Sequence, residues 1–161
     1  MKILIQQIAA FQRLGQDAVL LFLRLTVGWQ MFLTGKAKLS HLDRITRFFD
    51  SLHIPAPGFH ALLIGSIEML GGLALLIGLG ARGFSVLVAA AMMGAYLTAH
   101  RDEAFASVGD FIEAPPFPYL VVAWVVLVFG AGRSSLDHVI VRQLAKHGQT
   151  VHPLIDRESS P

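Results

Sequence analysis

Four long apolar stretches, each interrupted by few or no charged residues, dominate the chain. They cover residues 18–35, 59–79, 83–99 and 116–132. A membrane-spanning helix needs about 17–25 such residues, because the hydrocarbon core of a bilayer is about 30 Å thick. That core holds no water, so each segment has to satisfy its own backbone polar groups as a helix. The pattern therefore predicts an all-α fold, a polytopic membrane four-helix bundle.

Amphipathic segments flank and connect the predicted spans. In residues 1–16 apolar positions share one helical face, which predicts an interfacial helix and an uncleaved anchor, rather than a signal peptide. A second short interfacial helix is expected in the loop 36–58, ended by Pro55. A third amphipathic segment completes the predicted domain, 1–147, and the polar tail 148–161 is expected to be disordered.

The connections between the spans predict their arrangement. Residues 80–83 form a tight turn, so the second and third spans make an antiparallel hairpin. The acidic, proline-rich segment 101–118 predicts a stiff, non-helical approach to the fourth span. An even number of spans leaves both termini on one side, which carries seven Lys and Arg residues against five on the other. Cytoplasmic termini are therefore favoured.

The high hydrophobic content and low charge of the chain indicate a protein surrounded by lipid. It is 54% hydrophobic and 15% charged, with a mean hydropathy of +0.60, whereas soluble domains carry about 25% charged residues. The net charge is only +2, and the basic residues fall at the ends of the apolar stretches. This placement suits lipid headgroups and argues against nucleic acid as a partner.

The residue types present restrict the chemistry of the chain. It has no cysteine, which removes disulfides, thiol redox chemistry and thiolate metal sites. No span carries a pair of histidines four residues apart, and no metal, haem or flavin motif occurs. A redox role would therefore need a bound carrier, such as a quinone, or a partner protein.

Glu68 lies near the middle of the second span, where a charged side chain costs at least about 2.5–3.5 kcal/mol. Gly65, Gly71 and Gly72 surround it and form a face that another helix can approach closely. The carboxyl is either structural, locking the bundle as an ion pair or a protonated acid, or it handles protons and contacts a quinone-like molecule. The residues leave both interpretations open.

Arg24 interrupts the first span and shares one helix face with Gly28, Gly35 and Lys38. Its guanidinium has three possible environments: the Glu68 carboxylate, the lipid headgroups, or other acceptors in the bundle. Pairing with Glu68 is favoured, since counting from the ends of the apolar stretches separates the two by about 8 Å. The two glycines permit close packing with another helix of this chain or of a second copy.

Two further polar residues are candidate contacts within the bundle. Gln30 lies at a depth similar to Glu68 and either makes an interhelical hydrogen bond or donates to the Arg24–Glu68 site. His100 ends the third span and is either an interfacial hydrogen-bonding group or a group that binds or protonates a substrate. At the other end of the spans, a contact between Arg82 and Asp137 would hold the two helix hairpins together, with Arg133 beside them.

The chain resembles DoxX-type integral membrane proteins over residues 21–137. The resemblance rests on short segments in a fixed order, among them Ile-Glu-Met-Leu-Gly-Gly around Glu68 and Gly-Ala-Gly-Arg-Ser-Ser-Leu-Asp near the C-terminus. The full set of segments is 23–28, 35–39, 48–57, 67–72, 78–82 and 130–137. The family pattern implies a polar signature formed by Arg24, Lys38, Glu68, Arg82, Arg133 and Asp137.

This resemblance implies a four-helix protein of the bacterial inner (plasma) membrane. Similar members are linked to quinol-dependent oxidoreduction, which implies an accessory subunit or partner of a quinone-linked oxidoreductase, at most a membrane subunit. Glu68 and Arg24 would be the catalytic pair, and Gln30, His100 and Lys38 would contact the quinone. The alternative is a non-enzymatic scaffold or small-solute transporter with a structural Arg24–Glu68 pair. The expected partners are the lipid bilayer, another membrane or redox protein, and a second copy of the chain.

Overall fold

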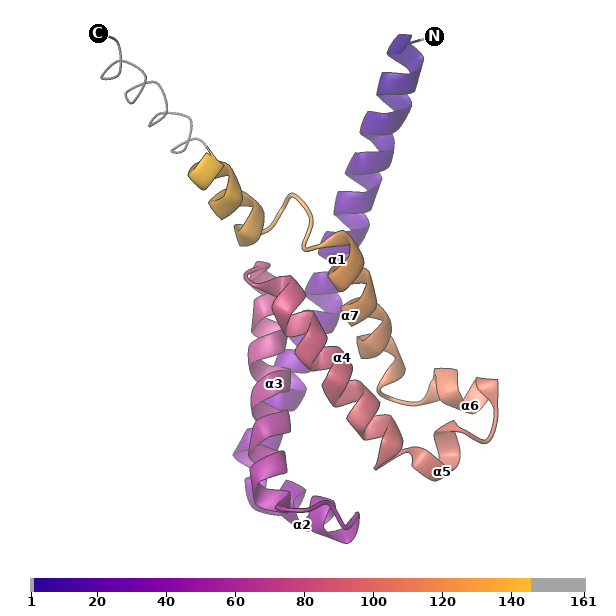
Figure 1. Cartoon of the computed structure of the whole chain (residues 1–161), viewed down its shortest axis with the longest axis vertical. Coiled ribbons are helices and arrows are strands. Elements are labelled where there is room, and N and C mark those ends of the chain that lie inside the picture. Colours follow the sequence, from indigo (N-terminus) through magenta and orange to yellow (C-terminus); the bar gives the residue numbers. More distant parts are fainter. Residues whose placement is uncertain (1, 146–161) are drawn as a thin grey trace, which may run out of the picture.

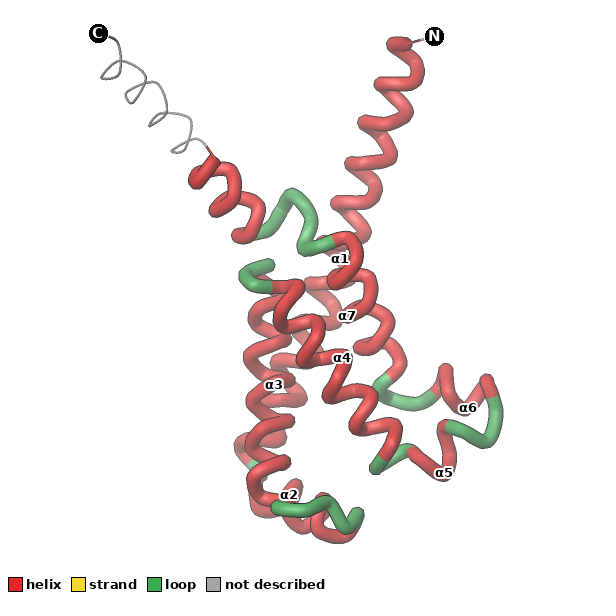
Figure 2. Tube along the Cα trace, viewed as in Figure 1, coloured by secondary structure: helices red, strands yellow, loops and turns green. Residues whose placement is uncertain are grey.

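A computed structural model describes residues 2–145, apart from the side chains of residues 2–5, 8, 9 and 103. The described chain is all-helical, which confirms the predicted fold class (Figures 1 and 2). The helices are α1 (Lys2–Ser40), α2 (Leu42–Ser51), α3 (Pro57–Ile77), α4 (Ala81–Leu97), α5 (Arg101–Ala104), α6 (Val108–Glu113) and α7 (Phe117–Phe129). Residues 136–145 are also helical. The predicted tail, 148–161, lies outside the described residues.

The four predicted spans fall on α1, α3, α4 and α7, and these helices form the bundle. α1 packs along α3, α4 packs along α7, and α3 and α4 form the predicted antiparallel hairpin. By length and composition, α1 from Ala10 onward and α3 can cross a membrane. α4 and α7 are apolar but shorter, at 17 and 13 residues. A 13-residue helix is about 20 Å long, so a crossing at α7 has to include its uncharged flanking residues.

The first helix differs from expectation because it is continuous. Residues 2–16 were expected as a separate interfacial helix, but they run without a break into the first span as one helix of 39 residues. No proline interrupts this region, and the lone Gly15 costs only about 1 kcal/mol relative to alanine, which does not end a helix. As a result, the first turns of α1 project beyond the bundle (Figure 1).

The connections are shorter than expected at one end of the bundle and more helical at the other. The α3–α4 turn occupies residues 78–80 rather than 80–83, because Gly78, at φ 70°, ends α3 in the left-handed conformation that glycine favours. The interfacial helix expected before Pro55 is α2, which has no buried residues. The acidic segment after α4 contains two short helices, α5 and α6, before the non-helical approach to α7.

The bundle therefore has two distinct ends. We call the end with residues 78–80 and the C-terminus of α7 the turn end, and the end with α2, α5 and α6 the loop end (Figure 1). The first turns of α1 and the helix 136–145 both leave the bundle at the turn end (Figure 1). This placement agrees with an even number of spans.

Small residues let α1 and α3 approach closely. A Cβ atom added at Gly72 would lie 2.6 Å from the carbonyl oxygen of Gly28, and one added at Gly28 would lie 2.9 Å from the carbonyl oxygen of Gly72. Gly35 similarly lies against the backbone of Glu68 and Met69. The glycine face predicted on the first span thus contacts α3 of the same chain and is not left open for a second copy.

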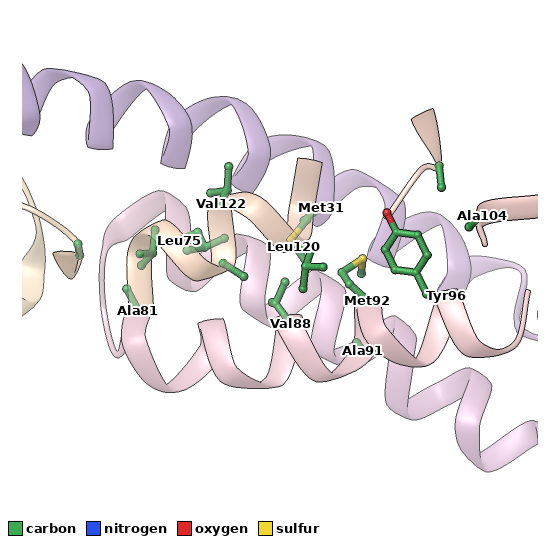
Figure 3. Packing of buried hydrophobic residues seen from close by; sticks show 14 residues of the cluster. Met31, Leu75, Ala81, Val88, Ala91, Met92, Tyr96, Ala104, Leu120 and Val122 are labelled. Carbon is green, nitrogen blue, oxygen red and sulfur yellow. The ribbon is translucent and has the colours of Figure 1, made fainter. Parts of the chain in front are cut away.

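The core forms where α4 and α7 meet the α1–α3 pair. Met31, Leu75, Val88 and Met92 point into it from three helices (Figure 3). Tyr96 closes the core toward the loop end, where its ring stacks on Phe111 at 4.5 Å and its hydroxyl donates to the Phe111 carbonyl at 2.7 Å. This contact anchors the α5–α6 segment to α4.

Large apolar side chains also cover the outside of the bundle. They project from all four bundle helices and include Phe22, Trp29, Leu62, Leu97, Trp124 and Val128. Monomeric soluble proteins rarely expose contiguous apolar patches of more than a few hundred square ångströms. The outer surface is therefore suited to lipid.

The close contact of α1 and α3 can be tested by adding one methyl group. Gly72→Ala should lower the free energy of unfolding by about 1–3 kcal/mol, because the new Cβ meets the α1 backbone. Gly94→Ala is the matched control: this glycine is also helical, but nothing lies within 4 Å of an added Cβ. The unfolding free energies would be measured by titration with SDS in mixed micelles. Equal effects of the two substitutions would contradict the packing described.

Candidate functional site

Arg24 is fully buried where α1 crosses the last turn of α3, and backbone carbonyls surround its guanidinium. Nε donates to the Leu75 oxygen at 2.7 Å, and Nη2 donates to the Leu76 oxygen at 3.2 Å. Nη1 donates to the oxygen of Ala131, just after α7. Carbonyls in the last turn of a helix lack intrahelical partners and form the negative end of the helix dipole. Arg24 therefore caps α3 and connects it to α1 and to the exit of α7.

The favoured Arg24–Glu68 pair is wrong, and so is the snorkelling alternative. Leu75, the residue that Arg24 contacts, lies about two helical turns beyond Glu68, or roughly 10 Å along α3. The prediction estimated the depth of each side chain by counting residues from the ends of the apolar stretches. This count does not give the register of α1 on α3. That register is set by the contact of Gly28 with Gly72, which places Arg24 at the end of α3.

Glu68 instead pairs with Lys38, whose Nζ lies 2.5 Å from Oε1. The Glu68 side chain is 6% exposed and the Lys38 side chain is 31% exposed, so the carboxylate lies inside and the ammonium near the rim. The second carboxylate oxygen, Oε2, is buried and has no hydrogen-bond partner within the described part of the chain. Leaving a buried polar atom unsatisfied costs about 1–3 kcal/mol.

A small cavity of about 210 Å³ adjoins this ion pair. It lies between α1, α3, α4 and the start of α7, toward the loop end of the bundle. Polar groups from Lys38, Glu68, His100 and Tyr119 line it beside apolar carbon. The complete lining is Thr34, Lys38, Glu68, Met92, Ala95, His100, Pro115, Pro116 and Tyr119.

The structure thus brings together three of the five predicted catalytic or quinone contacts. Glu68, Lys38 and His100 share the cavity. Arg24 lies at the turn end, and the Gln30 side chain is exposed on the outside of α1. The expected placement of Gln30 beside Arg24 and Glu68 is therefore wrong. The prediction failed because Gln30 lies on the exposed face of α1, away from α3.

Tyr119 is the residue of this cavity that the sequence analysis missed. It comes shortly after Pro116 and carries the one hydroxyl group of the otherwise apolar helix α7. A tyrosine at the proline-marked start of an apolar span was a usable signal. The partly buried hydroxyl of Thr34 belongs to the same cavity, but it donates to its own helix, to the Met31 carbonyl at 3.0 Å.

At the turn end, Asp137 joins the segment after α7 to the α3–α4 turn, although not through Arg82. Its carboxylate accepts hydrogen bonds from the backbone N–H groups of Gly80 at 2.8 Å and Ala81 at 3.2 Å. Its own N–H donates to the Gly78 oxygen at 3.0 Å. A carboxylate at these unpaired N–H groups caps the start of α4 and complements its dipole. The expected Arg82–Asp137 contact is corrected to a backbone cap.

Arg133 connects the segment after α7 to α1. Its backbone N–H donates to Oδ1 of Asp17 at 3.1 Å, and its Nε lies 4.0 Å from Oδ2. The Arg133 side chain is 60% exposed, so the ion pair itself contributes little. Within residues 2–145, no three His, Cys, Asp or Glu side chains lie close enough together to hold a metal ion.

Comparison with known proteins assigns the chain to a family. The DoxX family model matches residues 19–101. The chain belongs to the DoxX family. The matched stretch contains Arg24, Lys38, Glu68 and Arg82, and Arg133 and Asp137 follow it. This DoxX protein is therefore a membrane protein, as its composition and outer surface indicate.

One curated relative carries a functional name. A Bacillus subtilis (strain 168) protein named "Putative oxidoreductase CatD" is 32% identical to this DoxX protein over 91 residues. The aligned residues make up 56% of this chain and 66% of that protein, slightly less than two thirds of its length. No solved structure matches the chain.

The capping role of Arg24 predicts that charge alone cannot replace it. Arg24→Lys should lower the free energy of unfolding by about 1–3 kcal/mol for each carbonyl left without a donor, because an ammonium lacks the guanidinium fork. Arg47→Lys on the exposed surface of α2 is the control and should change little. SDS unfolding followed by circular dichroism measures both. A fully stable Arg24→Lys protein would disprove the role.

The Lys38–Glu68 contact predicts energetic coupling between the two side chains. Lys38→Met, Glu68→Gln and the double variant form a cycle, which should give a coupling energy of about 0.5–3 kcal/mol. Lys38→Met alone is the most damaging, because it leaves a buried carboxylate without its counter-charge. The same unfolding titration measures all three variants. A coupling energy near zero would show that the pair does not form.

Proposed function

We propose that this DoxX protein is a membrane subunit of a quinone-linked oxidoreductase system and binds a quinone headgroup at the Lys38–Glu68 cavity. One observation carries the proposal: the Glu68 side chain lines a cavity, and its buried Oε2 atom has no protein partner among the described residues. Buried polar atoms in native structures are nearly always satisfied by protein, water or ligand. A ligand that donates a hydrogen bond would satisfy this one.

The side chains around the cavity fit a quinone headgroup. Glu68 offers an acceptor to a quinol hydroxyl, and Lys38, Tyr119 and His100 offer donors to a quinone carbonyl. Met92 adds an apolar wall for the ring. Drug-sized ligands use cavities of about 300–1,000 Å³, so a cavity of about 210 Å³ suits one ring with its tail left in the lipid.

The residues of the cavity would handle protons, while a partner would supply the electrons. A bound quinone provides a carrier of two electrons and two protons. Glu68 would hold or accept a proton at Oε2, Lys38 would balance the charge of the carboxylate, and Tyr119 and His100 would orient the headgroup. The chain has no cysteine for thiol redox chemistry. The name of the Bacillus subtilis relative supports an oxidoreductase context.

We also propose the bacterial inner membrane as the location, with the turn end and the termini on the cytoplasmic side. The count of seven Lys and Arg residues against five supports this orientation. Another membrane or redox protein is the partner this role requires. A homo-oligomer would have to form without Gly28 and Gly35, because these residues already contact α3.

A non-enzymatic scaffold or small-solute transporter is the second candidate. One observation favours it: Lys38 already neutralises Glu68, so the pair also serves as a structural link between α1 and α3. In this candidate the structural pair is Lys38–Glu68, not Arg24–Glu68.

Quinone content separates the two candidates. Protein purified in mild detergent is extracted with organic solvent, and the quinone is quantified by mass spectrometry. The unchanged protein should carry near-stoichiometric quinone, and Glu68→Gln should reduce it about tenfold while remaining folded, because it loses a charged hydrogen-bond acceptor. Glu113→Gln is the matched control, since this exposed glutamate lies outside the cavity. Quinone at the detergent background in the unchanged protein would favour the scaffold.

A further inference from the structure

A larger groove lies at the turn end, remote from the Lys38–Glu68 cavity. Its volume is about 520 Å³. Its lining residues come from α1, the start of α4 and the chain after α7, and these segments lie at the turn end of the bundle (Figure 1). Each of these elements contributes one arginine, Arg13, Arg82 and Arg133 in that order, and His138 lines the groove from the C-terminal helix. The groove is therefore predominantly basic.

The two carboxylates that line the groove already have partners within the chain. Both oxygens of Asp137 accept hydrogen bonds from the backbone at the start of α4. Asp17 binds the backbone and side chain of Arg133. In the part of the chain that the structure describes, no carboxylate lies within 4.0 Å of the guanidinium of Arg13 or Arg82. Arg13 and Arg82 thus form no direct ion pair within the described chain.

The backbone, not an acid, positions the Arg82 guanidinium. A Cβ atom at Gly130 would lie 3.3 Å from Nη2 and 3.4 Å from Nε of Arg82. Gly130 has φ 79°, a conformation that side chains rarely adopt. The missing side chain lets the guanidinium lie against the segment after α7, where it lines the groove. Its hydrogen-bond donors remain available to an external acceptor.

His138 adds a second unsatisfied group. Its Nε2 atom is buried and has no hydrogen-bond partner in the described residues, while its backbone N–H donates to the Ser135 hydroxyl at 3.3 Å. An imidazole nitrogen donates a hydrogen bond when it is protonated. An anionic oxygen of a ligand would satisfy such a donor.

We propose that this groove binds a phosphate group, with Arg82 as the principal ligand and Arg13 and His138 as additional ligands. The planar guanidinium fork matches two phosphate oxygens. The groove lies where the apolar bundle ends, which is the depth of phospholipid headgroups, and it is also open to phosphate in solution. The site is independent of the proposed quinone role, since it shares no residue with the Lys38–Glu68 cavity.

The test compares two probes on the same variants. The lipid probe is dioleoylphosphatidylglycerol, added to the purified protein in non-ionic detergent and measured by native mass spectrometry. The soluble probe is radiolabelled inorganic phosphate, measured by equilibrium dialysis at constant ionic strength. The variants are Arg82→Gln and Arg13→Gln, and Arg13 lies on an exposed part of α1 where folding is not at risk. Arg47→Gln removes the same charge from α2 at the loop end and serves as the control.

We expect Arg82→Gln to weaken binding about tenfold or more, because it removes a charge-assisted hydrogen bond, and Arg13→Gln to weaken it less. Arg47→Gln should leave it unchanged. Loss of lipid binding alone identifies a headgroup site, and loss of phosphate binding alone identifies a soluble ligand. Both results support the proposal. Equal binding by all three variants, or no binding of either probe to the unchanged protein, would overturn it.

Discussion

The close approach of α1 and α3 determines where the two buried charges, Arg24 and Glu68, find their partners. Glycines 28 and 72 remove the side chains that would separate the two helices, and the backbones fix one register. In that register Arg24 reaches the free carbonyls at the end of α3, and Lys38 reaches Glu68 near its middle. A shift of one turn would move each charge to a position without its partner. The contact between Gly28 and Gly72 thus gives both buried charges a partner within one bundle.

The two buried charges, Arg24 and Glu68, are satisfied to different degrees. Each of the three guanidinium nitrogens of Arg24 donates a hydrogen bond to a backbone carbonyl. Glu68, which lines a cavity, has one oxygen paired and one unpaired. A buried charged group whose polar atoms all have partners can be accommodated in a fold. A buried charged group with an unpaired polar atom costs free energy until a partner binds that atom. The bundle is therefore capped at the turn end and leaves a polar atom free nearer the loop end.

The sequence predicted the helices and the presence of a buried acid, but not the partners of the charges. Apolar length and turn residues sufficed for α1, α3, α4 and α7, because these features are local. The partner of Glu68 depends on the register between α1 and α3. Counting residues along the sequence does not give that register, so the prediction favoured Arg24 over Lys38. The Asp137 cap was missed for a related reason, since its acceptors bind backbone N–H groups that no side-chain pattern reveals. Tyr119 lies in the predicted fourth span, but the prediction treated that whole span as apolar.

The position of the Lys38–Glu68 pair also bears on access. The ammonium is nearly one-third exposed while the carboxylate is almost fully buried, so the pair extends from the rim of the bundle into its interior. In the proposed function, a ligand arriving from the lipid or the interface would meet the positive charge of Lys38 before the Glu68 carboxylate. This order suits a headgroup that carries acceptors when oxidised and donors when reduced, because Lys38 donates and Glu68 accepts. A purely structural ion pair gains nothing from leaving Oε2 without a partner, and that asymmetry is the physical argument for a binding site.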